Sequence, residues 1–200
     1  MTRYACLLRG VNVSGQRKVA MKELVSLCQS LGFSNVESYL QSGNIVLDAP
    51  LGATELEAAL EQAIRNEFGY TDIDVLARTA PEIGAVIESM PAAWKTHDTS
   101  LLYFTFLKSA PAAVSNAASF LPDEFEAGEK VIYIHCPGGY GKTKLNNNYF
   151  ERTLKLRATT RNWNTTVKLY ELAQEPPPIL GRGRPAAYMV GYGRSGPSGN

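Results

Sequence analysis

The sequence predicts an α+β protein built from two ferredoxin-like (βαββαβ) sandwich halves, followed by a C-terminal helix and a flexible tail. Three observations lead to this prediction. Short apolar runs typical of strands alternate with segments whose apolar residues recur every three or four positions, as on one face of a helix. In the first part of the chain these segments follow the order strand, helix, hairpin, helix, strand. A similar order returns after residue 100, although no sequence repeat relates the two parts.

The N-terminal half is expected at residues 1–80, where local signals mark the ends of the helices. Gly32 is placed to end the first helix in the left-handed conformation that glycine adopts readily. Thr54 and Glu57 have the spacing of a capping box at the start of the second helix. The expected elements are a strand at 4–8, a helix at 21–31, hairpin strands at 36–40 and 45–47, a helix at 54–68 and a strand at 73–77.

The remaining chain is expected to form a helical linker at 81–100, a C-terminal α+β half at 101–175 and a tail at 176–200. The run at 101–107 is rich in aromatic residues and nearly free of polar ones, which predicts a central strand. The tail is rich in Pro, Gly, Ser and Arg and predicts an extended or disordered segment. The other expected elements are helices at 81–90, 111–120, 145–156 and 163–172, hairpin strands at 125–128 and 131–134, and a short strand at 158–161.

The composition predicts a cytoplasmic protein with no metal and no cofactor. The chain has 200 residues and is 44% hydrophobic, which is enough for a substantial core. Its formal net charge is +1, so nucleic-acid binding would have to come from a local patch rather than from bulk charge. The three cysteines form no C-x-x-C pair, and only two histidines are present, which favours reduced thiols over disulfides or a metal site. The start of the chain lacks a signal-peptide pattern, and no apolar run approaches membrane-spanning length.

Three separated polar blocks at the ends of predicted elements, at 9–12, 42–44 and 159–166, suggest one shared ligand site. Arginine offers a planar fork for phosphate, asparagine and serine hydrogen-bond to sugars and bases, and tryptophan offers a flat face for stacking. A Gly-rich loop at 136–143 is not a P-loop, but it presents Lys142 and Lys144 to an anion or to solvent. The candidate ligand-binding residues are Arg9, Asn12, Ser42, Asn44, Lys144, Arg161, Asn162 and Trp163.

Each block also has a purely structural interpretation. Residues 42–44 have the composition that a tight turn requires, and residues 9–15 suit a turn between a strand and a helix. Asn162 is a good helix cap and Trp163 a good core residue, although neither role accounts for Arg161. No histidine has neighbours that suggest a catalytic triad, so no catalytic residue is predicted.

Four stretches together resemble the signature of a bacterial family known as domain of unknown function 1697. They are residues 8–15 (LRGVNVSG), 39–46 (YLQSGNIV), 141–145 (GKTKL) and 161–165 (RNWNT). The resemblance covers about residues 3–173 and implies a two-part α+β architecture, but the family has no established activity. Ser14 stands where the family usually has the first of two glycines.

The sequence is compatible with three functions. The first is a binding module for a phosphate-bearing ligand, either a nucleotide or single-stranded RNA, in a polar cleft between the two halves. In that hypothesis Arg9, Lys144 and Arg161 meet phosphate, Asn12 and Asn44 contact sugar or base edges, and Trp163 stacks. The second is an enzyme acting on a phosphorylated small molecule, and the third is an adaptor without a ligand.

Overall fold

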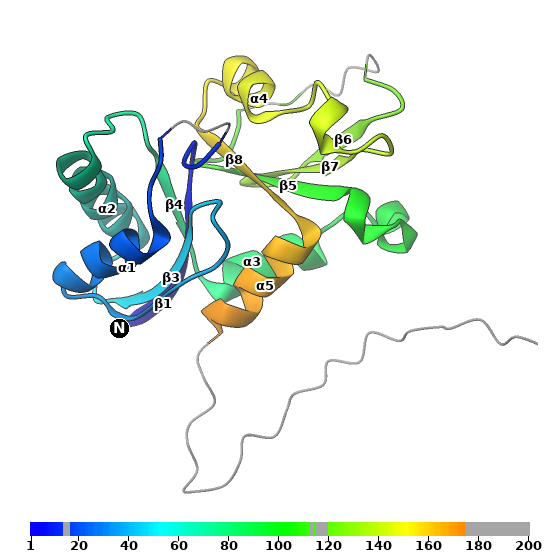
Figure 1. The fold of residues 1–200 in the computed structure, drawn as a ribbon. Helices are drawn as coiled ribbons and strands as arrows, with labels where there is room; N and C mark the ends of the chain where they lie inside the picture. Colours follow the sequence, from blue (N-terminus) through cyan, green and yellow to red (C-terminus); the bar gives the residue numbers. More distant parts are fainter. Residues whose placement is uncertain (14–16, 113, 115–119, 175–200) are drawn as a thin grey trace, which may run out of the picture.

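The computed structural model describes residues 1–13, 17–112, 114 and 120–174. Within them, two four-stranded antiparallel sheets and five α-helices form a mixed α/β architecture (Figure 1). The predicted tail at 176–200 lies outside the described residues, as does most of the helix predicted at 111–120. No helix in the described part of the chain is long and apolar enough to cross a membrane.

The N-terminal sheet has the strand order β2-β3-β1-β4, with α1 and α2 packed on one face. Because side chains alternate along a strand, Tyr4 and Cys6 of β1 face these helices, while Ala5 and Leu7 face the opposite side. The elements are β1 (Thr2–Leu8), α1 (Met21–Ser30), β2 (Ser34–Ser38), β3 (Asn44–Ala49), α2 (Ala53–Phe68) and β4 (Val75–Arg78).

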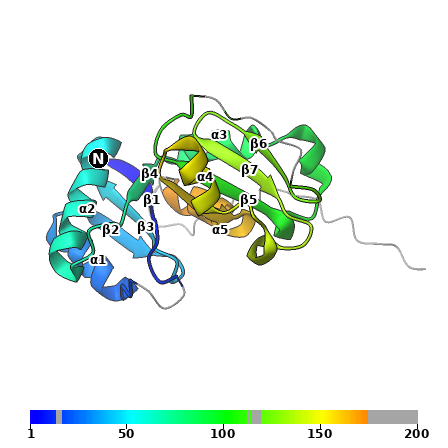
Figure 2. The ribbon, with the colours of Figure 1, turned by 90° about the horizontal axis from the view of Figure 1, so that it is seen from above.

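The C-terminal sheet has the strand order β6-β7-β5-β8, so β5 is an inner strand, as its apolar run predicts. Figure 2 shows helix α4 lying over one face of this sheet. Phe150 of α4 packs into the buried cluster on that face. Two 3₁₀ turns, Ala92–Thr96 and Thr99–Leu101, precede β5. The elements are β5 (Leu102–Leu107), β6 (Glu124–Ala127), β7 (Val131–His135), α4 (Asn147–Leu154), β8 (Ala158–Asn162) and α5 (Trp163–Ala173).

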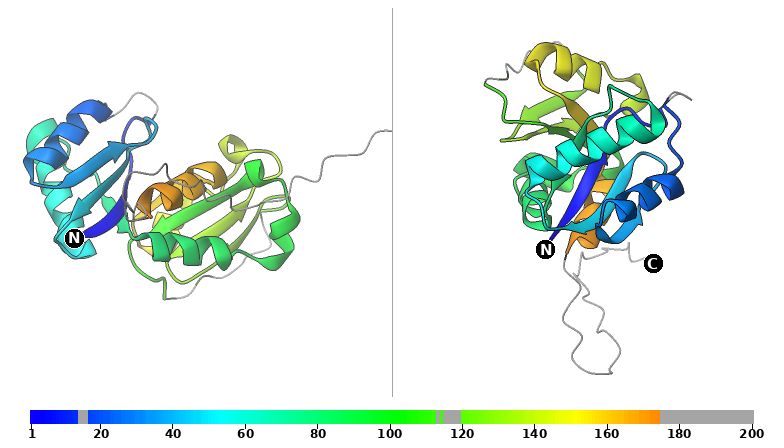
Figure 3. Two further views of the ribbon diagram at one scale, coloured as in Figure 1. Left: turned by 90° about the horizontal axis from the view of Figure 1, so that it is seen from below. Right: turned by 90° about the vertical axis from the view of Figure 1, so that its left-hand side faces the viewer.

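The two sheets share a buried cluster in the middle of the molecule, into which α3 (Ala80–Glu88) and α5 pack. The cluster joins Leu7 and Val46 of the N-terminal sheet to Phe104 and Phe106 of the C-terminal sheet. Figure 3 shows α3 and α5 lying together along the C-terminal sheet. The boundary between the halves is therefore a packed interface.

The capping box predicted from Thr54 and Glu57 is wrong. Helix α2 begins one residue earlier, with Gly52 as its cap, and the Glu55 carboxylate accepts a hydrogen bond from the Gly52 amide at 3.4 Å. Glu57 lies on the helix face that packs against the sheet, where it is buried, accepts the Ala77 amide at 2.8 Å and pairs with Lys108. The Thr–Glu spacing is local, whereas the burial of Glu57 depends on distant elements. The left-handed helix end at Gly32 is confirmed, with φ +84°.

Candidate functional site

A pocket of about 470 Å³, lined by both polar and apolar residues, lies between the two halves. The end of β1 and the turn before β3 form one side of it, and the start of α4 together with β8 forms the other. Its described lining contains three arginines and no carboxylate. The polar lining residues are Arg9, Arg17, Ser42, Tyr140, Asn146, Asn147, Asn148, Thr159, Thr160 and Arg161.

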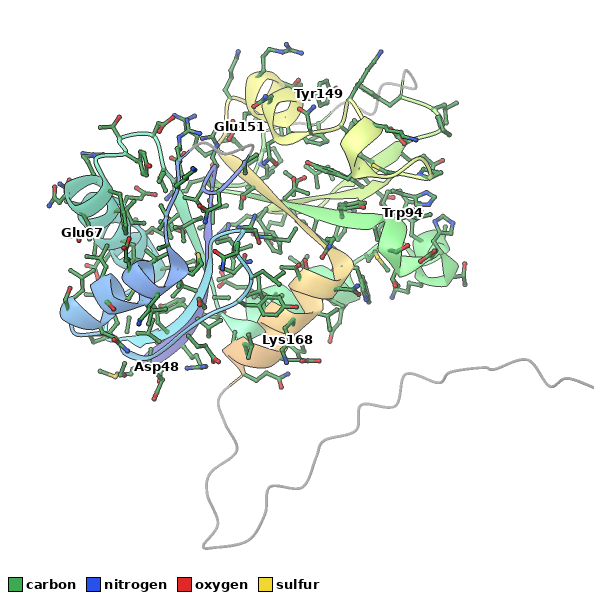
Figure 4. All side chains as sticks on the ribbon, viewed as in Figure 1. Asp48, Glu67, Trp94, Tyr149, Glu151 and Lys168 are labelled. Carbon is green, nitrogen blue, oxygen red and sulfur yellow. The ribbon has the colours of Figure 1, made fainter. Side chains whose placement is uncertain are left out.

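Arg9 follows β1 and crosses the boundary to Glu151 on α4. Its Nε and Nη2 atoms donate to the two carboxylate oxygens of Glu151 at 2.5 Å and 2.7 Å. Asp74 lies further away, with its Oδ2 atom 3.8 Å from Nη1. Figure 4 labels Glu151 on the side of α4 nearest the N-terminal half. Hydrogen bonding to Glu151, together with its negative charge, raises the pKa of Arg9. Arg9 therefore stays positively charged, and the Glu151 carboxylate balances that charge.

Arg161 on β8 crosses the boundary in the opposite direction, but its acceptors among the described residues are all neutral. The side chain is buried, and burial lowers the pKa of Arg161 to about 10. Its acceptors are Asn44 Oδ1 at 2.6 Å, Thr159 Oγ1 at 2.7 Å and the carbonyls of Thr160, Leu8, Ser42 and Gly43 at 2.9, 2.9, 3.2 and 3.3 Å. These six acceptors occupy the five N–H groups of a guanidinium. Arg161 thus ties the halves together and brings a positive charge to the pocket wall.

The turn between β2 and β3 is shaped to receive Arg161. Asn44 is fully buried, and its Nδ2 atom donates to the Tyr39 carbonyl and to the Ser42 hydroxyl. Gly43 has φ +73°, and a Cβ atom there would lie 2.3 Å from the Val11 side chain. Only glycine fits this close approach without displacing the loop after β1. Ser42 lines the pocket, whereas Asn44 stands behind it against Arg161.

Asn12 fastens the loop after β1 instead of lining the pocket. Its side chain accepts the Val19 amide and donates to the Val19 and Gln41 carbonyls at 2.9 Å and 2.8 Å. Its φ of +55° is one that asparagine tolerates better than most residues. Asn12 thereby joins the loop to the turn that carries Ser42.

The other three predicted ligand residues are absent from the described lining of this pocket. Lys144 is exposed on the approach to α4 and is absent from the described lining. Asn162 caps α5, as its structural interpretation predicts, by accepting the Thr165 amide at 2.8 Å. Trp163 is half-buried and packs on Phe104 with the ring centroids 5.8 Å apart.

Several pocket residues were missed by the sequence analysis, above all the three asparagines at 146–148. The run of identical amides at a helix start was a visible signal, but it was interpreted only as part of a polar helix. Tyr140 and Thr160 were also missed. The Tyr140 hydroxyl donates to Thr160 Oγ1 at 3.1 Å, and Thr160 donates to Asn147 Oδ1 at 2.6 Å. This chain of hydrogen bonds orients the Asn147 amide at the pocket wall.

The described residues contain no cluster of three or more His, Cys, Asp or Glu side chains that could hold a metal ion. The three cysteines are free and buried, and burial raises the pKa of Cys28 to about 12 and that of Cys136 to about 11. The rings of His97 and His135 are in contact outside the described pocket lining, with centroids 4.3 Å apart and planes tilted by 40°. The pocket chemistry is thus that of arginine, amide and hydroxyl groups.

Comparison with known proteins adds a family but no activity. The model of a family described as a protein of unknown function (DUF1697) matches residues 1–133. The solved structure of a conserved bacterial protein from Streptococcus pneumoniae is 27% identical, with a TM-score of 0.65. The match covers 86% of this chain and 99% of that one. No curated protein sequence matches the chain. The family match ends before α4 and β8, which supply half of the pocket.

Proposed function

The chain belongs to this family of proteins of unknown function, and we propose that it binds a phosphate-bearing ligand of nucleotide size in the pocket between its halves. One observation carries the proposal: a buried arginine stands in the pocket wall, and the described residues provide neither a carboxylate partner for it nor an acidic lining for the pocket. An isolated buried charge is costly, because the protein interior solvates it poorly. A bound anion would supply the missing counter-charge.

The pocket volume favours a nucleotide over single-stranded RNA, the alternative ligand. A volume of about 470 Å³ falls within the range of ordinary small-molecule sites. Proteins that bind single-stranded RNA usually hold it along an extended basic groove, whereas this chain has a net charge of only +1. The proposed ligand is therefore compact and carries at least one phosphoryl group.

Each wall of the pocket has a role in the proposal. Arg9 and Arg17 meet the phosphoryl oxygens, and Arg161 contributes its charge from the pocket wall. Ser42 and the asparagines at 146–148 hydrogen-bond to sugar or base edges. Asn147 also begins α4, whose N-terminus carries the positive end of the helix dipole. The proposal assigns no ligand contact to Lys144, Asn162 or Trp163.

An adaptor function without a ligand is the second candidate, and the Arg161 contacts favour it. All N–H groups of Arg161 already have protein acceptors, so the conspicuous polar blocks have a structural use in joining the halves. An adaptor predicts that changes at Arg161 alter stability and nothing else.

We also propose that both halves are ferredoxin-like sandwiches. The order β6-β7-β5-β8 corresponds strand for strand to β2-β3-β1-β4. The element order of the N-terminal half supports the same assignment. The buried free thiols fit a reducing compartment, which supports a cytoplasmic location.

Isothermal titration calorimetry with pyrophosphate, nucleoside monophosphates and diphosphates, and a short oligoribonucleotide tests the proposal. We expect nucleotides to bind with an affinity that falls as salt rises, and Arg9→Ala to weaken binding at least tenfold. Arg3→Ala is the matched control, because Arg3 pairs with Glu37 and Asp48 outside the pocket. Affinity that grows with RNA length would favour RNA, and absence of binding by every probe would reject the proposal.

A further inference from the structure

In this structure each of the three pocket arginines is already engaged. Arg161 is occupied by neutral acceptors and buried. Arg17 pairs with Asp72 in a pair whose carboxylate is half exposed. Arg9 holds Glu151 through two N–H groups, with only 17% and 13% of the two side chains exposed. A phosphoryl group that binds the Nε–Nη2 edge of Arg9 must therefore take the place of Glu151.

Displacement of Glu151 from Arg9 is the exchange with the largest expected effect on ligand affinity. An exposed ion pair such as Arg17–Asp72 contributes little, so its loss or gain changes binding little. The Arg9–Glu151 pair is partly buried, and two parallel hydrogen bonds form it. Two oxygens of a phosphoryl group have the geometry to occupy the same fork as the two oxygens of a carboxylate.

Glu151 is also placed so that it can be released. Its Oε1 atom accepts the Ala158 amide at 2.9 Å, so the carboxylate keeps a partner when Arg9 leaves. Asn147, which lines the pocket, is four residues before Glu151 on α4, and residues with this spacing share a helix face. The competing carboxylate therefore stands one helical turn from a pocket amide.

We propose that Glu151 is an internal competitor for Arg9, which a phosphoryl group displaces on binding and which thereby sets the affinity of the site. This inference rests on the proposed function. It implies that the ligand presents two oxygens to Arg9 and carries more negative charge than the carboxylate that it displaces. The bond between the halves through Arg9 and Glu151 is then exchanged for one through the ligand.

The test is titration with pyrophosphate by calorimetry at fixed pH and ionic strength, using the full chain. We expect Glu151→Gln to bind about tenfold more tightly than the unaltered protein, because the amide competes poorly for Arg9. Asp48→Asn is the matched control: it removes the same charge from an ion pair with Arg3 that is similarly shielded, with Asp48 19% exposed, and should leave affinity unchanged. Glu151→Asp keeps the charge on a shorter side chain, and its affinity for pyrophosphate should lie between that of the unaltered protein and that of Glu151→Gln. This variant decides the matter if Glu151→Gln does not fold.

Three results would overturn the inference. Equal or weaker binding by Glu151→Gln and Glu151→Asp, with binding by the unaltered protein, would show that Glu151 positions Arg9, and the proposed function would stand. An equal gain in pyrophosphate affinity for Asp48→Asn would show that the effect of Glu151→Gln comes only from the change in overall charge. Absence of binding by the unaltered protein and by every Glu151 variant would reject the inference and the proposed function together.

Discussion

Arg9 and Arg161 cross the same boundary in opposite directions, but they differ in the charge of their partners and in their burial. Arg9 reaches from the N-terminal half to a carboxylate on α4, in a pair that remains partly exposed. Arg161 reaches from the C-terminal half to carbonyl and amide oxygens around the Ser42–Asn44 turn and is buried. One arginine is neutralised by a charge, and the other is only solvated by dipoles.

The partner of an arginine, and not the arginine alone, decides whether its charge is available to an anion. A guanidinium held by neutral oxygens keeps its field, because dipoles compensate a charge only in part. A guanidinium held by a carboxylate is available to an anion only by exchange.

Arg161→Ala should have the largest effect, a loss of about 4 kcal/mol in the free energy of unfolding. Among the described residues, the substitution leaves the buried Asn44 Oδ1 atom and the Ser42 carbonyl without a donor. It also removes one of the two donors to each of the Leu8 and Gly43 carbonyls. Urea unfolding measures the loss. Arg157→Ala is the control, since Arg157 is 54% exposed and should cost less than about 1 kcal/mol. Similar losses for the two variants would contradict the structural role given to Arg161.

Gly43→Ala should cost about 3 kcal/mol, because it disturbs the turn that supplies the Arg161 acceptors. The new Cβ would meet the Val11 and Leu8 side chains at 2.3 Å and 2.9 Å and would force a positive φ on alanine. Gly32→Ala separates the two causes, since Gly32 has a positive φ but nothing within 4 Å. We expect about 1 kcal/mol for Gly32→Ala in the same unfolding experiment. Equal costs would show that the close approach at Gly43 is unimportant.

Asn44→Asp would turn the Arg161 site into a second version of the Arg9 site. A carboxylate beside Arg161 neutralises the charge that the pocket offers to an anion. We expect pyrophosphate affinity to fall about tenfold. Asn66→Asp on the exposed side of α2 makes the same chemical change outside the pocket lining and should leave affinity unaltered. Unchanged affinity in Asn44→Asp would show that the Arg161 charge does not reach the ligand.

The smallest expected effect is the coupling energy between Arg9 and Glu151, about 1 kcal/mol in a double-mutant cycle on stability. Because the pair is ionic and partly exposed, the coupling should shrink as salt screens it. The corresponding cycle for Arg161 and Asn44 should depend little on salt, since its acceptor is neutral and both residues are buried. Urea unfolding at low and high salt compares the two cycles, and equal salt dependence would remove the distinction between the two arginines.

Local signals in the sequence determined the order of the helices and strands and several of their ends. The apolar run of β5 predicted an inner strand, and Asn162 was recognised as a possible cap for α5. These signals act over a few residues, through backbone hydrogen bonds and side-chain spacing, so they can be read without the fold. The Thr54–Glu57 misassignment shows their limit, because burial overrode a correct local spacing.

Which polar residues share a pocket, and which partner each of them binds, depends on how the whole chain packs. The sequence brought Arg9, Ser42 and Arg161 under one hypothesis, but it carried no sign of Glu151 as the partner of Arg9. Those two residues are 142 positions apart, and Arg161 lies 153 positions from the Leu8 carbonyl that it binds. The charge, the exposure and the unused hydrogen-bonding groups of a side chain depend on such distant partners. Packing of the whole chain brings these partners together.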